Sequence, residues 1–561
     1  MKERLEKAIK EALGELGLPS VDFSLEHPKE LSHGDYMTNV ALIVGKQESQ
    51  NPIELAEKIV ENFNNQKIEG IEKVGVAGPG FINFTLKREA FAKALSDAQD
   101  KEWGNTEVYA GKKILVEHSS PNLFKPFHIG HLMNNTIGEA LYRLAKRSGA
   151  EKATPISFPS DISLGIAKAI YVLREDFGKD FFPSDISVLG DAYVRGTKAY
   201  EDDKYGEETG IHPVIRDIAN KLYSKDPSGE YLDIYEKCKD FNIKYFEKVV
   251  ETLGSKFEGY IFESEAGEKG KTIVIDNLEI FQKSTGAIIY VPEESKKLHT
   301  AVFINSDGNP TYEAKDIGLL YLKFKNYNNP DISITVTDNQ QTSHFDVVID
   351  AAGKINPLWQ KNSIHRSHGR MTFKGAKMSS RLGGVPLAEE MINAVVEEVK
   401  EKNKDISEQS AREIAVSAIK FTILKAKAGS NINFDPETSL SFEGDSGPYL
   451  QYTAVRAGAL IEKGKALNIS PSPESPVVGT ETLERLVARF LEVVERAQRE
   501  WAPHYIVTYL LELAQEFNSW YGQGKIVDEG DVSGTAYRLY VASSVRQSLI
   551  NGLWVLGIET P

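Results

Sequence analysis

Short apolar segments alternate with amphipathic helical patterns from about residue 112 to about residue 400. The segments at 113–117, 301–305 and 332–337 are rich in β-branched residues, which is typical of buried strands. Strands that are separated by a helix can pair in parallel, because the helix carries the chain back to the same edge of the sheet. The alternation therefore predicts a parallel α/β sheet, and the mixed pattern between about 160 and 300 predicts insertions into it.

Different patterns flank this region. Residues 1–100 combine helices with the run VGVAGPGFINFTL at 74–86, which indicates two strands joined by a Gly-Pro-Gly turn. From about residue 405 onward, apolar residues recur at helical spacing, which predicts an all-α bundle. We therefore predict a multidomain α/β protein with domains at 1–100, 110–400 and 405–561. The first domain has an apolar pattern of its own, so we expect the remainder to stay folded without it.

The bulk composition limits the classes of partner and compartment. The net charge of −15 argues against non-specific coating of nucleic acid, and we expect no DNA partner, although local basic faces can still bind RNA. The single cysteine, Cys238, excludes an intrachain disulfide and a cysteine-rich metal site, and favours a cytoplasmic setting. No apolar run approaches 18 residues, and the N-terminal helix lacks the apolar region of a signal peptide. We therefore expect no association with a membrane.

The run SSPNLFKPFHIGHLMNNTIGEAL, residues 119–141, leads from the strand at 113–117 into a helix. The N-terminus of a helix presents unpaired N–H groups, which suit an anion such as a phosphate. His128 and His131 are three residues apart, so both side chains can project from the first turn in a similar direction. Lys125 adds a cation just ahead of them. This combination favours contact with the phosphates of a nucleotide.

Two other interpretations of the histidines stay open at this point. They could be packed or capping residues, which is the commoner role of an arbitrary pair. They could instead bind a metal together with His118, although the motif offers no acidic residue at a suitable spacing. Gly130 favours the phosphate interpretation, because it keeps the residue between the histidines small and lets a ligand approach.

A second signal, GAKMSSRLGG, occupies residues 375–384. Lys377 stands in a Gly/Ser-rich loop from which its ammonium group could reach a triphosphate and release it again. Taken alone, a loop of this composition is as often structural as functional. Its value comes from its pairing with the histidine motif at the other end of the α/β region.

Together the two motifs resemble the signatures of class I aminoacyl-tRNA synthetases. Residues 128–131 spell the "HIGH" signature in full, and Lys377-Met378-Ser379-Ser380 resembles "KMSKS". Ser380 departs from the pattern, because the family's second lysine is missing there. The Ser-Pro-Asn and Lys-Pro ahead of HIGH resemble the arginyl-tRNA synthetases, in which the lysine at the position of Lys125 is thought to replace the missing one. The resemblance covers essentially the whole chain, with further matches at 33–42, 77–84, 189–201, 307–319 and 442–457.

This resemblance implies a fold and an activity. The expected fold is a Rossmann-like parallel-sheet catalytic domain with insertions, a small N-terminal tRNA-binding domain and a C-terminal helical anticodon-binding domain. The expected activity is that of an arginine–tRNA ligase, which uses ATP to form arginyl-adenylate and transfers arginine to the terminal adenosine of tRNA(Arg). Mg²⁺ would be carried by the nucleotide, with no metal site of the protein's own. We expect a cytoplasmic monomer.

The resemblance also assigns residues to the reaction. The catalytic residues would be Lys125, His128, His131 and Lys377. The ATP contacts would be Pro121, Gly130, His128, His131, Met378, Ser379 and Ser380. The arginine contacts would be Glu117, Asn122, Tyr312, Asp316 and Gln340, with Gln341 as the rival of Gln340. A guanidinium needs carboxylates and other acceptors, and Tyr312 and Asp316 are four residues apart on one predicted helical face. Asp161 has altered neighbours for the family, which leaves its role open.

The tRNA contacts would be Phe81, Asn83, Tyr449, Gln451 and Arg456. An aromatic face can stack on an unpaired base, and an amide can read the edge of that base. For Phe81, ordinary strand packing is an equally good interpretation. The chain ends in GIETP, where the family usually has Arg-Met. We expect this different ending to alter the surface that contacts the anticodon.

Two rival functions remain at this stage. One is a nucleotidyltransferase for a smaller substrate, since such enzymes share the H-x-G-H motif. The other is a non-catalytic RNA-binding relative that has kept the fold. Intact Lys125, His128, His131, Asp316 and Lys377 argue against the second rival.

Overall fold

The structure of the chain is a computed structural model. It describes residues 1–28, 30–66, 68–202, 210–224, 230–374 and 386–560. The chain forms two compact units. The first unit holds residues 1–103, 453–491 and 512–551, and the second holds residues 104–452, 492–511 and 552–561.

A five-stranded parallel sheet lies at the centre of the second unit. Its order is β12-β11-β5-β6-β7, and every neighbouring pair is parallel. The strands are β5 (Lys113–Glu117), β6 (Lys152–Ser157), β7 (Gly259–Tyr260), β11 (Ile332–Asp338) and β12 (Ser363–His368). The middle strand, β5, buries Ile114, Leu115 and Val116 almost completely. The parallel α/β fold expected from the alternation of strands and helices is therefore confirmed.

One predicted strand belongs to a different sheet. Residues 301–304 do form a strand, β10 (Ala301–Ile304), but it pairs antiparallel with β9 (Ala287–Tyr290), which in turn pairs antiparallel with β8 (Gln282–Ser284). Its assignment to the parallel sheet was wrong. The connection from β9 to β10 is short and carries no crossover helix, so the chain turns back on itself and the two strands run in opposite directions.

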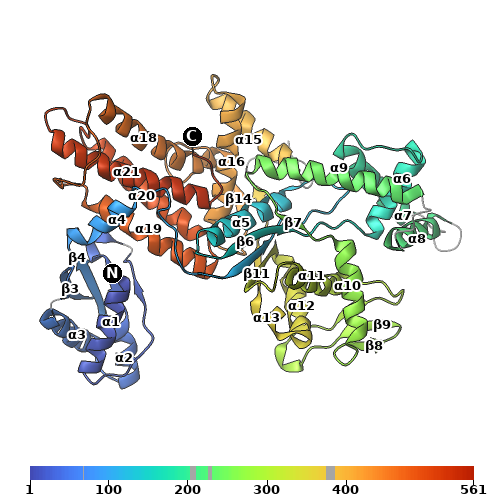
Figure 1. The fold of residues 1–561 in the computed structure, drawn as a ribbon, viewed down its shortest axis with the longest axis horizontal. Coiled ribbons are helices and arrows are strands. Elements are labelled where there is room, and N and C mark those ends of the chain that lie inside the picture. The colour runs from blue at the N-terminus through green and yellow to red at the C-terminus, as the bar shows by residue number, and fades with distance from the viewer. Residues whose placement is uncertain (29, 67, 203–209, 225–229, 375–385, 561) are drawn as a thin grey trace. The chain divides into compact units, whose positions relative to one another are not determined.

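Helices connect and follow the strands of the second unit. They are α5 (Ile129–Lys146), α6 (Leu164–Phe177), α7 (Ile186–Asp202), α8 (Ile211–Ser224), α9 (Glu230–Thr252), α10 (Glu263–Asp276), α11 (Tyr312–Asn326), α12 (Thr342–Ile355), α13 (Pro357–Asn362), α15 (Ala388–Lys402), α16 (Glu408–Lys425) and α17 (Pro436–Ser439). A short parallel pair, β13 (Met371–Phe373) and β14 (Ile432–Phe434), accompanies them. Between β6 and β7 the chain inserts α6–α9, and Figure 1 shows α6, α7 and α8 grouped at one end of the long helix α9. This insertion has a hydrophobic core of its own, which also takes in Leu123 and Phe124.

The N-terminal part of the first unit is a four-stranded antiparallel sheet with helices beside it (Figure 1). Its elements are α1 (Lys2–Glu15), β1 (Leu25–Glu26), β2 (Tyr36–Thr38), α2 (Val40–Glu48), α3 (Pro52–Gln66), β3 (Ile71–Ala77), β4 (Phe81–Leu86) and α4 (Ala92–Asp97). Burial alternates along β4: Ile82, Phe84 and Leu86 are buried, whereas Phe81 and Asn83 are only partly buried. The sheet therefore packs its core on one face and leaves the other more open.

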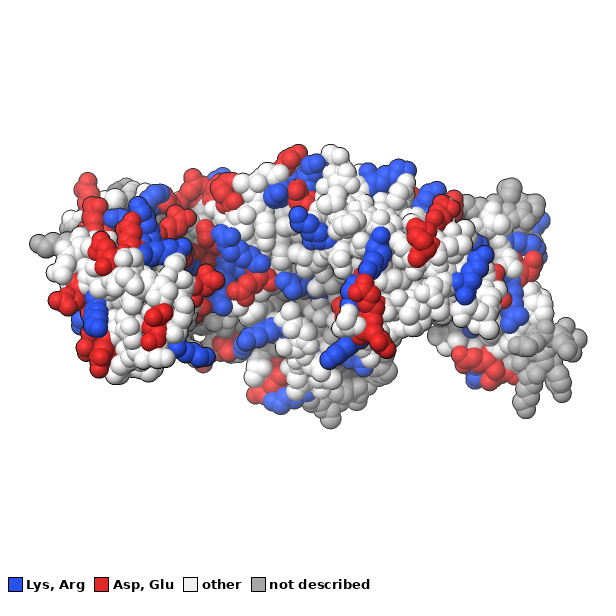
Figure 2. Space-filling model, turned by 90° about the horizontal axis from the view of Figure 1, so that it is seen from below, with Lys and Arg blue, Asp and Glu red and all other residues white. Residues whose placement is uncertain are grey.

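The C-terminal part of the chain is helical, as predicted. Its helices are α18 (Gly447–Ala466), α19 (Glu481–Glu500), α20 (His504–Gly522) and α21 (Val532–Val555). Within the first unit, Gly464 of α18 lies directly against Leu539 of α21. No helix among the described residues is long and apolar enough to cross a membrane. Figure 2 shows acidic and basic side chains interspersed over the face that it draws.

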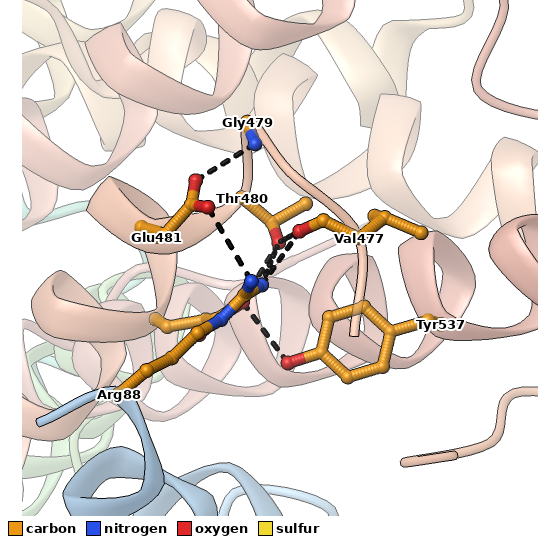
Figure 3. A network of polar contacts seen from close by, with 7 residues as sticks. Arg88, Val477, Gly479, Thr480, Glu481 and Tyr537 are labelled. Carbon is orange, nitrogen blue, oxygen red and sulfur yellow. Dashed lines mark hydrogen bonds and ion pairs between the residues drawn. The ribbon is translucent and has the colours of Figure 1, made fainter. Parts of the chain in front are cut away.

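A network of polar contacts around Arg88 joins the N-terminal part of the first unit to its helices (Figure 3). The guanidinium donates to both carboxylate oxygens of Glu484, at 2.8 and 2.5 Å, and to the carbonyl of Val477 at 2.6 Å. The hydroxyl of Tyr537 donates to the same Glu484 carboxylate at 3.0 Å. Because the Glu484 side chain is only 1% exposed, Arg88 supplies the counter-charge of a buried carboxylate.

Candidate active site

The loop after β5 is anchored at the carboxyl end of the neighbouring strand. The backbone N–H of Ser160 donates to the carbonyl of Pro121 at 2.9 Å, and the N–H of Leu123 donates to the carbonyl of Ser160 at 3.0 Å. These bonds hold Asn122 between the ends of β5 and β6, with its side chain exposed. The carboxyl ends of parallel strands are where open α/β sheets bind ligands.

Both histidines of the HIGH motif cap helix α5. The Nδ1 of His128 accepts from the backbone N–H of Gly130 at 3.1 Å, and the Nδ1 of His131 accepts from the backbone N–H of His128 at 3.3 Å. This reciprocal pattern is a capping box, and it stacks the two rings with their centres 3.7 Å apart. The capping interpretation is therefore confirmed, and it leaves the other ring nitrogen of each histidine for a ligand.

Capping also sets the protonation of the pair. Burial and nearby Lys125 lower the pKa of His128, and burial together with His128 lowers the pKa of His131 well below its ordinary value. A neutral imidazole whose Nδ1 accepts carries its proton on Nε2. At neutral pH the motif therefore offers two uncharged N–H donors, and the positive charge beside them comes from Lys125.

Gly130 is required by the packing of this turn. A Cβ atom at this position would lie 3.0 Å from Cε1 of His128 and press on the ring. Lys125 and His128 also line an open pocket of about 470 Å³, whose opposite wall is helix α7 with Tyr193 and Lys198. The helix N-terminus and Lys125 thus face a space large enough for part of a nucleotide.

The carboxylate of Asp316 lies in a cluster of charges on the neighbouring helices. The Nε2 of His344 lies 2.6 Å from Oδ2 of Asp316, and Nδ1 of His344 lies 3.6 Å from Glu313. Burial lowers the pKa of His344, but the hydrogen bonds to Asp316 and Glu313 outweigh burial and raise this pKa to about 10. His344 is therefore an imidazolium at neutral pH, held between two carboxylates.

Glu117, the second predicted carboxylate, already has a counter-charge. Its side chain is buried and forms an ion pair with Lys323 of α11. The hydroxyl of Thr335 donates to Glu117 at 3.3 Å, and Lys323 donates to Thr335 at 2.8 Å. A small cavity lies beside this group and is lined by Asp316, Lys323, Thr335 and His365 among others.

The other predicted arginine contacts lie at the same edge of the sheet. Tyr312 begins α11, and its side chain is 67% exposed. Gln340 and Gln341 are both exposed and follow the end of β11, where the N–H of Gln340 donates to Oδ1 of Asp338 at 2.8 Å. Exposure therefore does not distinguish Gln340 from Gln341, and the choice between them stays a prediction.

Asp161 lies in a buried network of polar contacts. Its buried carboxylate pairs with Lys239 at 2.7 Å and accepts from the hydroxyls of Tyr235 at 2.9 Å and Ser264 at 2.8 Å. These partners come from α9 and α10, so Asp161 ties the segment after β6 to the helices that follow it. The predicted loop residues Lys377, Met378, Ser379 and Ser380, together with Arg381, lie outside the described residues.

Two of the predicted tRNA contacts share one face of β4. Phe81 and Asn83 both lie on the face opposite the core, and the side-chain oxygen of Asn83 is buried with no hydrogen-bond partner among the described residues. The predicted contacts on α18 have different surroundings. Gln451 is only 4% exposed and donates to the carbonyl of Glu559 at 2.6 Å, and the guanidinium of Arg456 lies 4.8 Å from the ring centre of Tyr521. Tyr449 is partly buried.

Sequence reasoning missed several residues of this site. His344 was not singled out, although it stands three residues after Gln341 and so could have been placed on the same first helical turn. Lys323 and Tyr193 carried no local signal, because their partners are distant in the sequence. Within the described ranges, no three of His, Cys, Asp and Glu come together as a metal site would require.

Comparisons with known proteins agree along the length of the chain. Residues 3–86 match the arginyl tRNA synthetase N-terminal domain, residues 93–435 match the catalytic domain of class I (R) tRNA synthetases, and residues 450–561 match the DALR anticodon binding domain. The arginine–tRNA ligase of Alkaliphilus metalliredigens is 30% identical over 527 residues, covering 91% of this chain and 90% of that protein. The arginine–tRNA ligase of Borreliella burgdorferi is 28% identical over 573 residues, covering 96% of this chain and 94% of that protein.

Solved structures show the same fold. Arginyl-tRNA synthetase from Thermus thermophilus matches with a TM-score of 0.80 at 24% identity, covering 100% of this chain and 99% of that chain. Arginyl-tRNA synthetase from Plasmodium falciparum matches with a TM-score of 0.80 at 20% identity, covering 100% and 98% of the two chains. The class I catalytic match alone spans more than half of the chain. The chain therefore belongs to the arginyl-tRNA synthetases, a family of class I aminoacyl-tRNA ligases.

Proposed function

We propose that this arginine–tRNA ligase activates L-arginine with ATP at the N-terminus of α5 and transfers it to tRNA(Arg). One observation carries the proposal. A lysine and two neutral N–H donors at a helix N-terminus, which suit phosphates, stand in the same sheet-edge region as a carboxylate cluster with one unmatched negative charge, which suits a guanidinium.

In the first step, a carboxylate oxygen of arginine attacks the α-phosphorus of ATP. The bond from that phosphorus to the bridging oxygen breaks, and pyrophosphate leaves with the electron pair. Negative charge on the phosphate oxygens is then stabilised by Lys125 and by the Nε2–H groups of His128 and His131. A preorganised donor of this kind contributes about 2.7–4 kcal/mol of transition-state stabilisation. Lys377 would join them from its loop, as the sequence motif predicts.

Mg²⁺ is proposed to arrive on the nucleotide. The oxygens of a triphosphate suit this ion. When bound, Mg²⁺ supplies charge neutralisation along the phosphates. The residues proposed to contact ATP remain Pro121, Gly130, His128, His131, Met378, Ser379 and Ser380.

Recognition of arginine follows from a count of charges. Glu313 and Asp316 carry two negative charges, and the imidazolium of His344 neutralises one of them. One negative charge is left, which a guanidinium would match. The charge of Glu117 is already matched by Lys323, so we infer that the cluster of Glu313, Asp316 and His344, with its net negative charge, supplies the attraction and that Glu117 belongs to the framework. Asn122, Tyr312 and Gln340 would complete the hydrogen bonds.

In the second step, the 2′-hydroxyl of the terminal adenosine of tRNA attacks the carbonyl carbon of the adenylate, and AMP leaves. No residue needs to form a covalent bond with the substrate. The face of β4 with Phe81 and Asn83 is proposed to contact the tRNA, and Tyr449, Gln451 and Arg456 the anticodon side. Gln451 would have to leave its buried position to do so. We propose the cytoplasm as the location and a monomer as the working form.

The test is to charge total tRNA with each labelled amino acid in turn. We expect arginine alone to be incorporated, and ATP–pyrophosphate exchange to require both arginine and tRNA. Exchange with another small substrate in the absence of tRNA would instead identify a smaller-substrate nucleotidyltransferase. Binding of tRNA without any charging would identify a non-catalytic relative.

A further inference from the structure

The insertion between β6 and β7 holds the loop that carries Lys125. Phe124, the residue just before Lys125, has a φ of 63°, which is a strained backbone conformation for a residue with a bulky side chain. Its N–H donates at 2.6 Å to the side-chain oxygen of Asn242 on α9, and both residues are essentially buried. Asn242 therefore secures the turn that aims the lysine.

A second helix of the insertion holds the lysine side chain itself. The Nζ of Lys125 lies 4.1 Å from the ring centre of Tyr193 on α7. Helix α6 makes room for that ring at Gly165, where a Cβ atom would collide with the hydroxyl end of Tyr193. The ring is thus packed in one place and presents its face to the ammonium group.

An aromatic partner suits a lysine that has to serve a phosphate. A carboxylate partner would neutralise the ammonium, whereas the face of an aromatic ring attracts the ammonium and leaves its charge intact. A lysine side chain also has many rotamers, and ordering it beforehand removes part of the entropy cost of reaching the transition state. Besides Lys125, the charged residues that line the same pocket are Lys198 and Glu201, and both are exposed on α7.

We propose that Tyr193 is a positioning residue for adenylate formation: its ring holds the ammonium group of Lys125, and Asn242 holds the backbone turn before it. The insertion α6–α9 thereby acts on the chemistry of the H-x-G-H site, which no motif of the insertion indicates. This inference rests on the proposed role of Lys125 at the phosphates.

The experiment measures arginine-dependent ATP–pyrophosphate exchange, in the presence of tRNA, for Tyr193→Leu and Tyr193→Phe. The leucine variant loses the aromatic face, so kcat should fall by roughly 3- to 30-fold, the range that a cation–π contact supports. The phenylalanine variant keeps the face and should stay within about twofold of the unmodified enzyme. The loss should appear in kcat, because the ring positions a group that acts on the charge developing in the transition state.

A double-variant cycle separates positioning from folding. In the Lys125→Ala background, Tyr193→Leu should cause no further loss, because the group that it positions is gone. An equal loss with and without Lys125, or a Tyr193→Phe variant as impaired as Tyr193→Leu, would overturn the inference. If Lys125→Ala itself loses no activity, the proposed role of Lys125 fails first, and the two failures are thereby distinguished.

A third variant keeps the shape of the ring. Pentafluorophenylalanine at position 193 fills nearly the same volume as phenylalanine, but its face no longer attracts a cation. Its kcat should fall by the same roughly 3- to 30-fold, so the test holds even if the leucine variant is too unstable to measure. Activity equal to that of Tyr193→Phe would show that the ring serves packing alone.

Discussion

At the scale of single residues, the start of α5 separates charge from hydrogen bonding. Burial lowers the pKa of both His128 and His131, so the two rings are neutral at neutral pH and Lys125 supplies positive charge beside them. The loop motif makes Lys125 more important, because Ser380 stands where the motif usually has its second lysine.

Lys125→Ala should therefore lower the rate of adenylate formation by roughly 10²-fold or more, the effect of removing one preorganised donor. Single-turnover formation of labelled arginyl-adenylate measures this rate directly. A variant that activates arginine at nearly the original rate would contradict the compensation for Ser380, and Arg381 would be the next residue to test.

Asp316 should decide between arginine and its neutral analogue citrulline. Asp316→Asn removes one of the two negative charges around His344 and with it the net negative charge of the cluster. Breaking one half of a desolvated charged pair costs about 2–5 kcal/mol in kcat/KM for arginine. Citrulline has no positive charge that could pair with the carboxylate. The ratio of kcat/KM for arginine to kcat/KM for citrulline should therefore fall. Steady-state charging with both amino acids measures the ratio. An unchanged ratio would place Asp316 outside the pocket and leave Glu117 as the charged contact.

His118 should make the fold sensitive to acid. Burial lowers the pKa of His118 to about 4, below its ordinary value, so the unfolded chain binds a proton there that the folded chain does not. The stabilisation is complete above about pH 6.5 and is lost as the pH falls toward 4. From pH 7 to pH 5 the protein should lose about 2 kcal/mol more of its free energy of unfolding than the His118→Asn variant loses. Urea unfolding at both values measures this, and parallel losses would exclude His118 as the cause.

At the scale of elements, α5 depends on a close approach to the loop after β5. A Cβ atom at Gly138, in the middle of the helix, would overlap the ring of His118. Helix propensity alone favours alanine there, by about 1 kcal/mol, but overpacking a rigid core costs about 1–3 kcal/mol and should win.

Gly138→Ala should therefore destabilise the protein despite the better helix former. Gly14→Ala in α1 is the matched control, because no atom lies within 4 Å of a Cβ placed there. The control should leave stability unchanged or raise it slightly. Melting temperatures of the two variants give the comparison. If both melting temperatures shift in the same direction, the contact with His118 does not determine the effect of a substitution at Gly138.

At the scale of the whole molecule, Arg88 changes the expectation about the first domain. The apolar pattern of residues 1–100 suggested that the rest would stay folded without them. Within the first unit, however, Arg88 supplies the counter-charge of the buried Glu484 on α19 (Figure 3). Removing residues 1–100 would leave this carboxylate without its partner, so we now expect the truncated chain to be markedly less stable.

Arg88→Ala tests this without a deletion, and it should cost about 3–5 kcal/mol, as breaking one half of a buried ion pair does. Arg88 is 29% exposed, so the lower end of that range is the better expectation. Lys93→Ala, which removes an exposed pair with Asp97 in the same part of the chain, is the control and should change stability by less than about 0.5 kcal/mol. If denaturant unfolding shows equal changes in stability for both variants, the ion pair of Arg88 with Glu484 does not hold the two parts of the first unit together.

The sequence by itself determined what depends on neighbouring residues. The apolar run of β5, the start of α5 at the histidines, and the helical C-terminus could all be predicted, because periodicity and capping are local properties. The motifs also identified the family, since the residues of each motif lie close together in the sequence and keep fixed spacings.

The tertiary structure decided which distant groups meet. Only the fold shows that β10 lies in an antiparallel sheet, that His344 pairs with Asp316, and that Lys323 pairs with Glu117. Tyr193, the partner of Lys125, and Asn242, the partner of Phe124, stand on helices about 70 and 120 residues further along the chain, and no local pattern predicts these contacts. Strand pairing and buried charge pairs are set by contacts between segments, and a periodic pattern records which face of a segment is buried but not what is packed against it.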